Sequence, residues 1–159
     1  MSHTEKEFRT VRGYELLRQE DKVLTPSMED YLEMACRLSR GKGYSRVGDL
    51  AAALNVQPPS ASRMVQKLSG MGYVNYRKYG VVELTSRGQE LGDYLLKRHD
   101  TIEQFLSIIG VTEGILEETE KIEHNISEGT LERIRVLVAF MQEHRQWIDA
   151  FNDYQKKLR

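Results

Sequence analysis

Apolar residues recur three or four positions apart in several segments of the chain, a spacing typical of helices that bury one face. The first clear segment follows Thr25-Pro26-Ser27. Ser27 is suited to cap a helix there, and we expect this helix to span residues 27–40. The glycines at 41 and 43 supply the turn that ends it.

Two short helical segments come next. We expect one helix to begin at Ser45 and a second to run from the Pro58-Pro59 pair to Leu68 or Ser69, because proline is tolerated in a first helical turn. Two short helices joined by a tight turn form a helix-turn-helix, whose second helix enters the DNA major groove. The candidate DNA contacts on this second helix are Pro59, Ser60, Ser62, Arg63, Gln66 and Lys67.

A hairpin is predicted after the second helix. Residues 73–77 and 81–84 are rich in β-branched and aromatic side chains, and Lys78-Tyr79-Gly80 separates them. A hairpin at this place is the wing of a winged helix, and basic residues with a tyrosine at its tip suit the sugar-phosphate backbone. The candidate contacts here are Arg77, Lys78 and Tyr79, with Arg46 as a further basic residue.

The rest of the chain is predicted to be helical. Thr85-Ser86 caps a long helix that ends near Gly110, a shorter helix spans Thr112 to about Asn125, and Ser127 begins another. The tail from His144 has the pattern of one more helix. The fold class is therefore mainly α, with a winged helix-turn-helix followed by an all-helical part, to which the ligand pattern and the resemblance given below assign metal binding and dimerisation. The expected division is 1–24 (an N-terminal extension), 25–92 (DNA binding), 93–143 (dimerisation and metal binding) and 144–159 (a helical tail).

The composition fits a soluble protein in the cytoplasm. Of 159 residues, 40% are hydrophobic and 30% charged, and no apolar run approaches the ~20 residues of a membrane span. The charged N-terminus lacks the apolar centre of a signal peptide. The single cysteine, Cys36, excludes an internal disulfide and a thiolate zinc site within one chain.

The net charge of −1 hides an asymmetry. Between Lys42 and Arg98 there are nine basic and four acidic residues, whereas His99 to Glu143 contains ten acidic and three basic residues. A basic segment followed by an acidic one suggests contact with a polyanion and then binding of a cation.

The acidic segment contains a candidate metal site. In the segment 120–124, Glu123 and His124 lie three and four positions after Glu120, so these three residues share one helical face. Oxygen and nitrogen donors without sulfur favour Mn²⁺ or Fe²⁺, although zinc and cobalt would also bind in vitro, and four carboxylates with two imidazoles suffice for two ions. A single exposed carboxylate is usually only solvated, so the site requires that all candidates converge. They are Asp30, Glu33, His99, Glu120, Glu123 and His124.

Two other kinds of function fit parts of the pattern. A carboxylate-bridged metalloenzyme would use paired Glu-x-x-His segments, whereas here the spacing is Glu-x-x-Glu-His and Asp-x-x-Glu, so we expect no enzyme. A winged-helix regulator that responds to an organic ligand, or to Fe²⁺ or Zn²⁺, is the remaining alternative.

From about Leu24 to Glu143 the chain resembles the diphtheria toxin repressor family, in particular its two-domain, manganese-sensing members. The resemblance lies in residues 25–31, 64–68, 78–85, 98–99, 103–111 and 122–124. It implies that the six candidates match the manganese ligands one for one. Iron-sensing members have methionine where Asp30 stands and cysteine where Glu120 stands, so both carboxylates point to Mn²⁺. The resemblance further implies a homodimeric repressor that binds operators of manganese uptake genes, with neither a membrane partner nor a small organic substrate.

Overall fold

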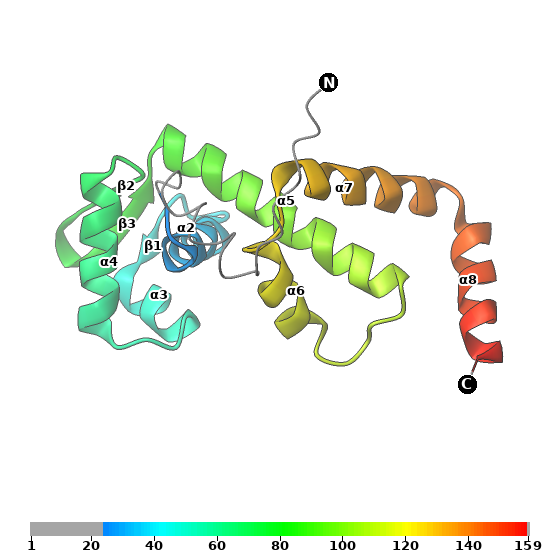
Figure 1. The fold of residues 1–159 in the computed structure, drawn as a ribbon. Coiled ribbons are helices and arrows are strands. Elements are labelled where there is room, and N and C mark those ends of the chain that lie inside the picture. Colours follow the sequence, from blue (N-terminus) through cyan, green and yellow to red (C-terminus); the bar gives the residue numbers. More distant parts are fainter. Residues whose placement is uncertain (1–23, 159) are drawn as a thin grey trace, which may run out of the picture.

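The computed structural model describes residues 24–158, so the predicted N-terminal extension lies almost entirely outside the described residues. Figure 1 shows two helical parts joined by the long helix α5 (Ser86–Ile108). On one side lies a winged helix-turn-helix, which we call the head. On the other side lie α6, α7 and α8. Within the described residues, none of the helices combines the length and apolar character needed to cross a bilayer.

The head begins with α2 (Pro26–Ser39), close to the predicted span. Thr25, and not Ser27, is the N-cap, and its side-chain oxygen accepts a hydrogen bond from the Met28 backbone N–H at 3.4 Å. The prediction missed this because Pro26 occupies the first helical position, where its lack of an N–H costs nothing. The buried face of α2 packs into the head's core through Met28, Tyr31 and Leu32.

The prediction that Ser45 opens a helix is wrong. Ser45 and Arg46 form a short strand, β1 (Ser45–Arg46), which pairs antiparallel with residues 81 and 82. The helix α3 (Val47–Ala53) begins only after it. A two-residue strand carries no periodic pattern of its own, because its partner strand lies more than 30 residues away in the sequence.

The predicted hairpin is present as β2 (Val74–Tyr76) and β3 (Val81–Leu84), and the sheet order is β1-β3-β2. The second helix of the helix-turn-helix, α4 (Pro58–Gly70), ends close to the predicted position. In the turn between α3 and α4, Asn55 has a left-handed backbone (φ 53°), a conformation that asparagine tolerates better than most residues.

Helix α5 starts as predicted, with Thr85 as its N-cap accepting from the Gly88 backbone N–H. Two glycines fit its first turns closely against the head. A Cβ at Gly88 would lie 1.9 Å from the Tyr73 carbonyl oxygen, and one at Gly92 would lie 3.0 Å from the Cβ of Cys36 on α2. Helix α5 continues without a break past residues 92 and 93. The two parts are therefore joined by a helix and not by a loop.

Three further helices complete the chain: α6 (Ile115–Glu123), α7 (Glu128–Glu143) and α8 (Arg145–Lys157). Helix α6 starts three residues later than predicted, because Gly114 adopts a left-handed backbone (φ 65°) immediately before it. Ser127 caps α7 as predicted. A second core of Ile102, Leu106 and Leu131 joins α5 to α7. Gln155 of α8 donates a hydrogen bond to the Ile109 carbonyl at 2.9 Å, so α8 is attached to the end of α5.

Candidate metal centre and DNA-binding surface

All six predicted ligands converge where α2, α5 and α6 meet. Three of them, Asp30, Glu120 and His124, form what we call the outer group, and the other three, Glu33, His99 and Glu123, form the inner group. Within each group, one donor atom per residue lies within 4.8 Å of the others. Residues as far apart in the sequence as Asp30 and His124 are therefore brought together.

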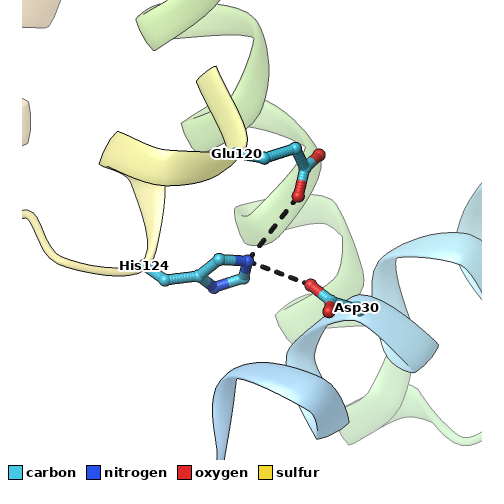
Figure 2. A group of neighbouring side chains, drawn as sticks. All are labelled: Asp30, Glu120 and His124. Carbon is cyan, nitrogen blue, oxygen red and sulfur yellow. Dashed lines mark ion pairs between the residues drawn. The ribbon is translucent and has the colours of Figure 1, made fainter. Parts of the chain in front are cut away.

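The outer group is shown in Figure 2, where His124 points between Asp30 and Glu120. Its Nε2 atom lies 3.0 Å from Asp30 Oδ1 and 3.8 Å from Glu120 Oε2. Both carboxylate side chains remain partly exposed, at 38% and 51%. This group is open to solvent and to ions.

The inner group is buried. His99 Nδ1 lies 3.7 Å from Glu33 Oε1 and 3.4 Å from Glu123 Oε2. Glu123 is completely buried, and His99 Nδ1 makes its hydrogen bond to the other oxygen, Oε1, at 3.4 Å. Among the described residues, Glu123 Oε2 therefore has an ion-pair neighbour but no hydrogen-bond donor. An ionised carboxylate in such a place is costly unless a cation compensates it.

Ionisation in the two groups reflects this crowding. Hydrogen bonds to Asp30, Glu120 and Glu29, the first being the strongest influence, raise the pKa of His124 to about 11. A hydrogen bond to Glu123 raises the pKa of His99. Burial raises the pKa of Glu33, and its ion pair with Arg37 only partly opposes this. A proton on His124 thus takes the place that a bound cation would occupy in the outer group, and Glu123 favours the protonated form of His99 in the inner group.

The two groups are adjacent. Glu120 Oε1 lies 3.5 Å from His99 Nδ1, and Glu123 Oε1 lies 3.9 Å from His124 Nε2, so each glutamate reaches into both groups. A cavity of about 260 Å³ gives access from solvent. It is lined by Asp30, Glu33, Met34, Ala53, Leu54 and Glu120.

The donor set fits a hard divalent cation. It contains four carboxylates and two imidazoles, and Cys36 is not part of it. The Cys36 thiol instead contacts Asp93 at 3.5 Å and accepts from Gln89 at 3.3 Å. This set is suited to Mn²⁺ or Fe²⁺ more than to a soft metal.

Three neighbours of the site were missed from the sequence. Glu29 contacts both Arg98 Nη2 (2.8 Å) and His124 Nδ1 (3.0 Å), and Glu103 lies 3.6 Å from His99 Nε2. Glu103 follows His99 by four residues on one helix, a spacing that signals proximity. Arg98 had been counted with the basic DNA-facing segment, but it is buried and paired with Glu29. Glu29 and Arg98 each precede a candidate ligand directly, a weaker signal.

The candidate DNA contacts lie together on the head, and most are exposed. Ser62 alone is half-buried among them. In the wing, Arg77 pairs with Glu83 at 2.6 Å, and Arg46 donates a hydrogen bond to the Tyr79 carbonyl at 3.2 Å. Tyr79 is 90% exposed and has a left-handed backbone, which places its ring at the tip. The remaining candidates are Pro59, Ser60, Arg63, Gln66, Lys67 and Lys78.

Helices α7 and α8 expose large apolar side chains. On α7 these are Val136, Leu137 and Phe140, and on α8 they include Trp147 and Tyr154. An exposed apolar surface of this extent on two adjoining helices is typical of a protein–protein interface.

Two protein-family models match the chain, one to each part. Residues 23–82 match the iron dependent repressor N-terminal DNA binding domain, and residues 85–146 match the iron dependent repressor metal binding and dimerisation domain. The first match covers nearly all of the head, and the second covers all of α5, α6 and α7.

Curated relatives match over most of the chain. The HTH-type transcriptional regulator MntR of Geobacillus kaustophilus is 46% identical over 134 residues, which is 84% of this chain and 95% of that protein. MntR of Lysinibacillus sphaericus is 48% identical over 121 residues, 76% of this chain and 87% of that protein.

Solved structures agree with these relatives. The manganese regulator SloR superimposes with a TM-score of 0.63 at 33% identity, covering 74% of this chain and 55% of that one. The IdeR protein of T. acidophilum gives a TM-score of 0.61 at 30% identity, covering 71% of this chain and 53% of that one. This similarity through both parts of the chain shows that the protein belongs to the diphtheria toxin repressor family of metal-dependent transcriptional regulators, in the branch that contains MntR.

Proposed function

We propose that this protein is a manganese-responsive transcriptional repressor that binds operator DNA as a homodimer when Mn²⁺ is bound. The observation that carries the proposal is Glu123, a fully buried carboxylate with one oxygen that no hydrogen-bond donor reaches within residues 24–158. It lies on α6 and shares the inner group with Glu33 of the head. A cation held there links the two parts of the chain.

The inner group and the outer group would each hold one ion, with Glu120 and Glu123 contributing to both. When bound, the cations supply the positive charge that neutralises the converging carboxylates. Asp30 and Glu33 bring α2 of the head to the site, His99 brings α5, and the remaining ligands bring α6. Without the cations these carboxylates repel one another, and the head is held less firmly against α6.

Manganese is the metal that the donor chemistry and the named relatives favour. Hard carboxylates at positions 30 and 120 suit Mn²⁺, and SloR, at 33% identity, is a manganese regulator. Another structural relative, ScaR, is described as a manganese-activated repressor and is 32% identical over 69% of this chain.

DNA binding would follow from the geometry of a dimer. The exposed apolar surface of α7 and α8 pairs two chains, and the two α4 helices enter successive major grooves about 34 Å apart. Because the cation raises DNA affinity only by favouring this arrangement, DNA must tighten cation binding by the same factor. We propose that these operators control manganese uptake genes. The protein would act in the cytoplasm and catalyse no reaction.

The decisive test is Mn²⁺-dependent DNA binding. Operator DNA is first selected from a random-sequence library with the Mn²⁺-loaded protein, and its affinity is then measured by fluorescence anisotropy with Mn²⁺ and with chelator. We expect Mn²⁺ to tighten binding and Glu123→Ala to abolish this response. Equal DNA affinity of Glu123→Ala and the parent at the same Mn²⁺ concentration would refute the proposal.

A matched control separates the metal site from the DNA surface. Lys67→Ala on the exposed face of α4 should weaken DNA binding and reduce its salt dependence by about one phosphate contact, while calorimetric Mn²⁺ affinity stays unchanged. The same calorimetry with Fe²⁺ and Zn²⁺ decides between metals. DNA binding that ignores every divalent ion would favour the organic-ligand alternative.

A further inference from the structure

The ring nitrogen of His124 that faces away from the outer group has its own partners. While Nε2 points to Asp30, Nδ1 lies 3.0 Å from Glu29 Oε2 and 3.3 Å from Arg98 Nη2. The same Glu29 oxygen accepts a hydrogen bond from Arg98 Nη2 at 2.8 Å. His124, Glu29 and Arg98 come from α6, α2 and α5, so this contact joins the same three helices as the metal site.

Glu29 and Arg98 are buried to a degree that sets them apart from the chain's surface ion pairs. Their side chains are 12% and 7% exposed, whereas Lys121 and Glu118 in the pair on α6 are 56% and 48% exposed. Burying such a pair costs solvation free energy, which is recovered only when geometry and hydrogen bonds are good. The Arg98 Nε atom is also buried without an acceptor among the described residues. Because the Glu29–Arg98 pair is costly to bury and lies beside the candidate ligand His124, an effect on that ligand is expected.

We propose that Glu29 is a positioning residue for His124, accepting its Nδ1–H so that Nε2 presents a lone pair to the metal, and that Arg98 holds Glu29 in place. The inference rests on the proposed metal site and adds to it two residues that do not touch the ion.

The chemistry follows from what each group is able to donate. A neutral imidazole has one N–H and one lone pair, and only the lone pair binds a metal. An ionised carboxylate only accepts, so Glu29 selects the form of His124 with the hydrogen on Nδ1. Arg98 only donates, and a bond from its Nη2 to Nδ1 would favour the opposite tautomer. The Nη2 atom lies closer to Glu29 (2.8 Å) than to Nδ1 (3.3 Å), and Nδ1 lies closer to Glu29 (3.0 Å) than to Nη2, so the contacts with Glu29 decide the tautomer. The lone pair is left on Nε2, the atom that faces Asp30 and Glu120.

The first test examines the wild-type protein directly. The chain is labelled with ¹⁵N at histidine and loaded with ¹¹³Cd²⁺, a diamagnetic probe whose coupling to nitrogen identifies the ligating atom. We expect His124 to show cadmium coupling at Nε2 and a proton on Nδ1. Coupling at Nδ1, or no coupling at His124 while other ligands bind, overturns the inference.

The second test uses two substitutions that remove the same charge. The carbonyl oxygen of Glu29→Gln still accepts from both Nδ1–H and Arg98, because one oxygen accepts both bonds in the parent. Glu29→Met has no acceptor. We expect Glu29→Met to weaken Mn²⁺ affinity about 10–100-fold, the usual effect of losing a hydrogen bond that orients a metal ligand. Glu29→Gln should weaken it by much less. Equal losses in the two variants would indicate a charge effect only, and an unchanged Met variant would exclude the role altogether.

Two controls complete the design. Glu118→Met removes an exposed carboxylate from α6 and should leave Mn²⁺ affinity unchanged. Circular dichroism verifies folding, and if Glu29→Met does not fold, the ¹⁵N experiment on the wild type decides alone. If the wild type binds no Mn²⁺, the proposed function fails. If the wild type binds Mn²⁺ through Glu123 but Glu29→Gln and Glu29→Met lose the same affinity, only the positioning role fails.

Discussion

The inner and outer groups have nearly the same chemistry but different surroundings. Each contains one histidine and two carboxylates. The inner group comes from α2, α5 and α6, and the outer group from α2 and the C-terminal end of α6. The inner group is buried, and its Glu123 has no exposed surface, whereas Asp30 and Glu120 of the outer group keep contact with water. Solvent therefore compensates the charges of one group and not those of the other.

This difference separates two tasks that one cluster performs. Water offsets much of the repulsion between exposed carboxylates. An ion in the outer group therefore replaces water that already stabilises the charges of Asp30 and Glu120. In the inner group the carboxylates are buried beside His99, Arg37 and each other, with His124 3.9 Å from Glu123, and a cation there offsets a larger penalty. The inner group is thus expected to couple the cation to stability, and the outer group to set how many ions bind.

The largest expected effect is on Glu123. Mn²⁺ at 100 times its Kd should stabilise the wild type by about 2.7 kcal/mol, or roughly 5–10 °C in Tm for a chain of this size. Glu123→Gln should lose this shift, and its metal-free Tm should not exceed that of the wild type, because the substitution also removes the buried partner of His99. Differential scanning fluorimetry measures both, with Glu118→Gln as the control. A full Mn²⁺ shift in Glu123→Gln would erase the distinction between the groups.

The next effect concerns stoichiometry. Asp30→Asn removes one charge from the outer group and leaves all three inner ligands in place. We expect isothermal titration calorimetry to show two Mn²⁺ ions per chain in the wild type and one in the variant. Two ions in both proteins would mean that the outer group binds its ion without Asp30, its one ligand on α2.

A smaller and continuous effect is expected from pH. The carboxylates around His124, Asp30 foremost, hold its pKa at about 11, and Glu123 raises that of His99. Below these pKa values both imidazoles are protonated, so Mn²⁺ must displace protons and its affinity falls as pH falls. Calorimetry in two buffers with different ionisation enthalpies should count one proton released from His124 and a further contribution from His99 that grows as pH falls. His144→Gln, far from the site, should leave the count unchanged, and zero release would contradict the expected ligand roles of the histidines.

The smallest effect is expected at Cys36, which belongs to neither group. Its thiol is buried against Asp93 and Gln89. Cys36→Ala should lower stability by about 1 kcal/mol and leave the affinities for Mn²⁺ and Zn²⁺ unchanged. Chemical denaturation and calorimetry measure the two. A selective loss of Zn²⁺ affinity would show that a thiolate takes part after all.

The helices and the six candidate ligands were accessible from the sequence because both depend on local spacing. Glu120, Glu123 and His124 share a helical face by their positions alone. Their convergence with Asp30 and Glu33 depends on how α2 packs against α5 and α6, and spacing carries no information on that packing. It was expected from the chemistry and from the family resemblance.

The features that were missed depend on distant parts of the chain. Ser45 lies in a strand because of its pairing with Val82, and Arg98 is buried because Glu29 lies on another helix. In both cases the local pattern favoured another assignment, a helix start for Ser45 and a DNA-facing charge for Arg98. Such residues are determined by a partner in space and not by their neighbours in the sequence.

The continuity of α5 limits the kind of motion by which this protein switches. Gly88 and Gly92 fit the first turns of the helix so closely to Tyr73 and Cys36 that these turns move with the head. The last turns are fixed to α7 through Leu106. Free swinging about a linker is therefore excluded, and a change in head orientation requires bending of α5 beyond Gly92 or a shear of α6 across it. Over a helix about 35 Å long, a bend of a few degrees displaces the head by an ångström or more, enough to misalign two half-sites.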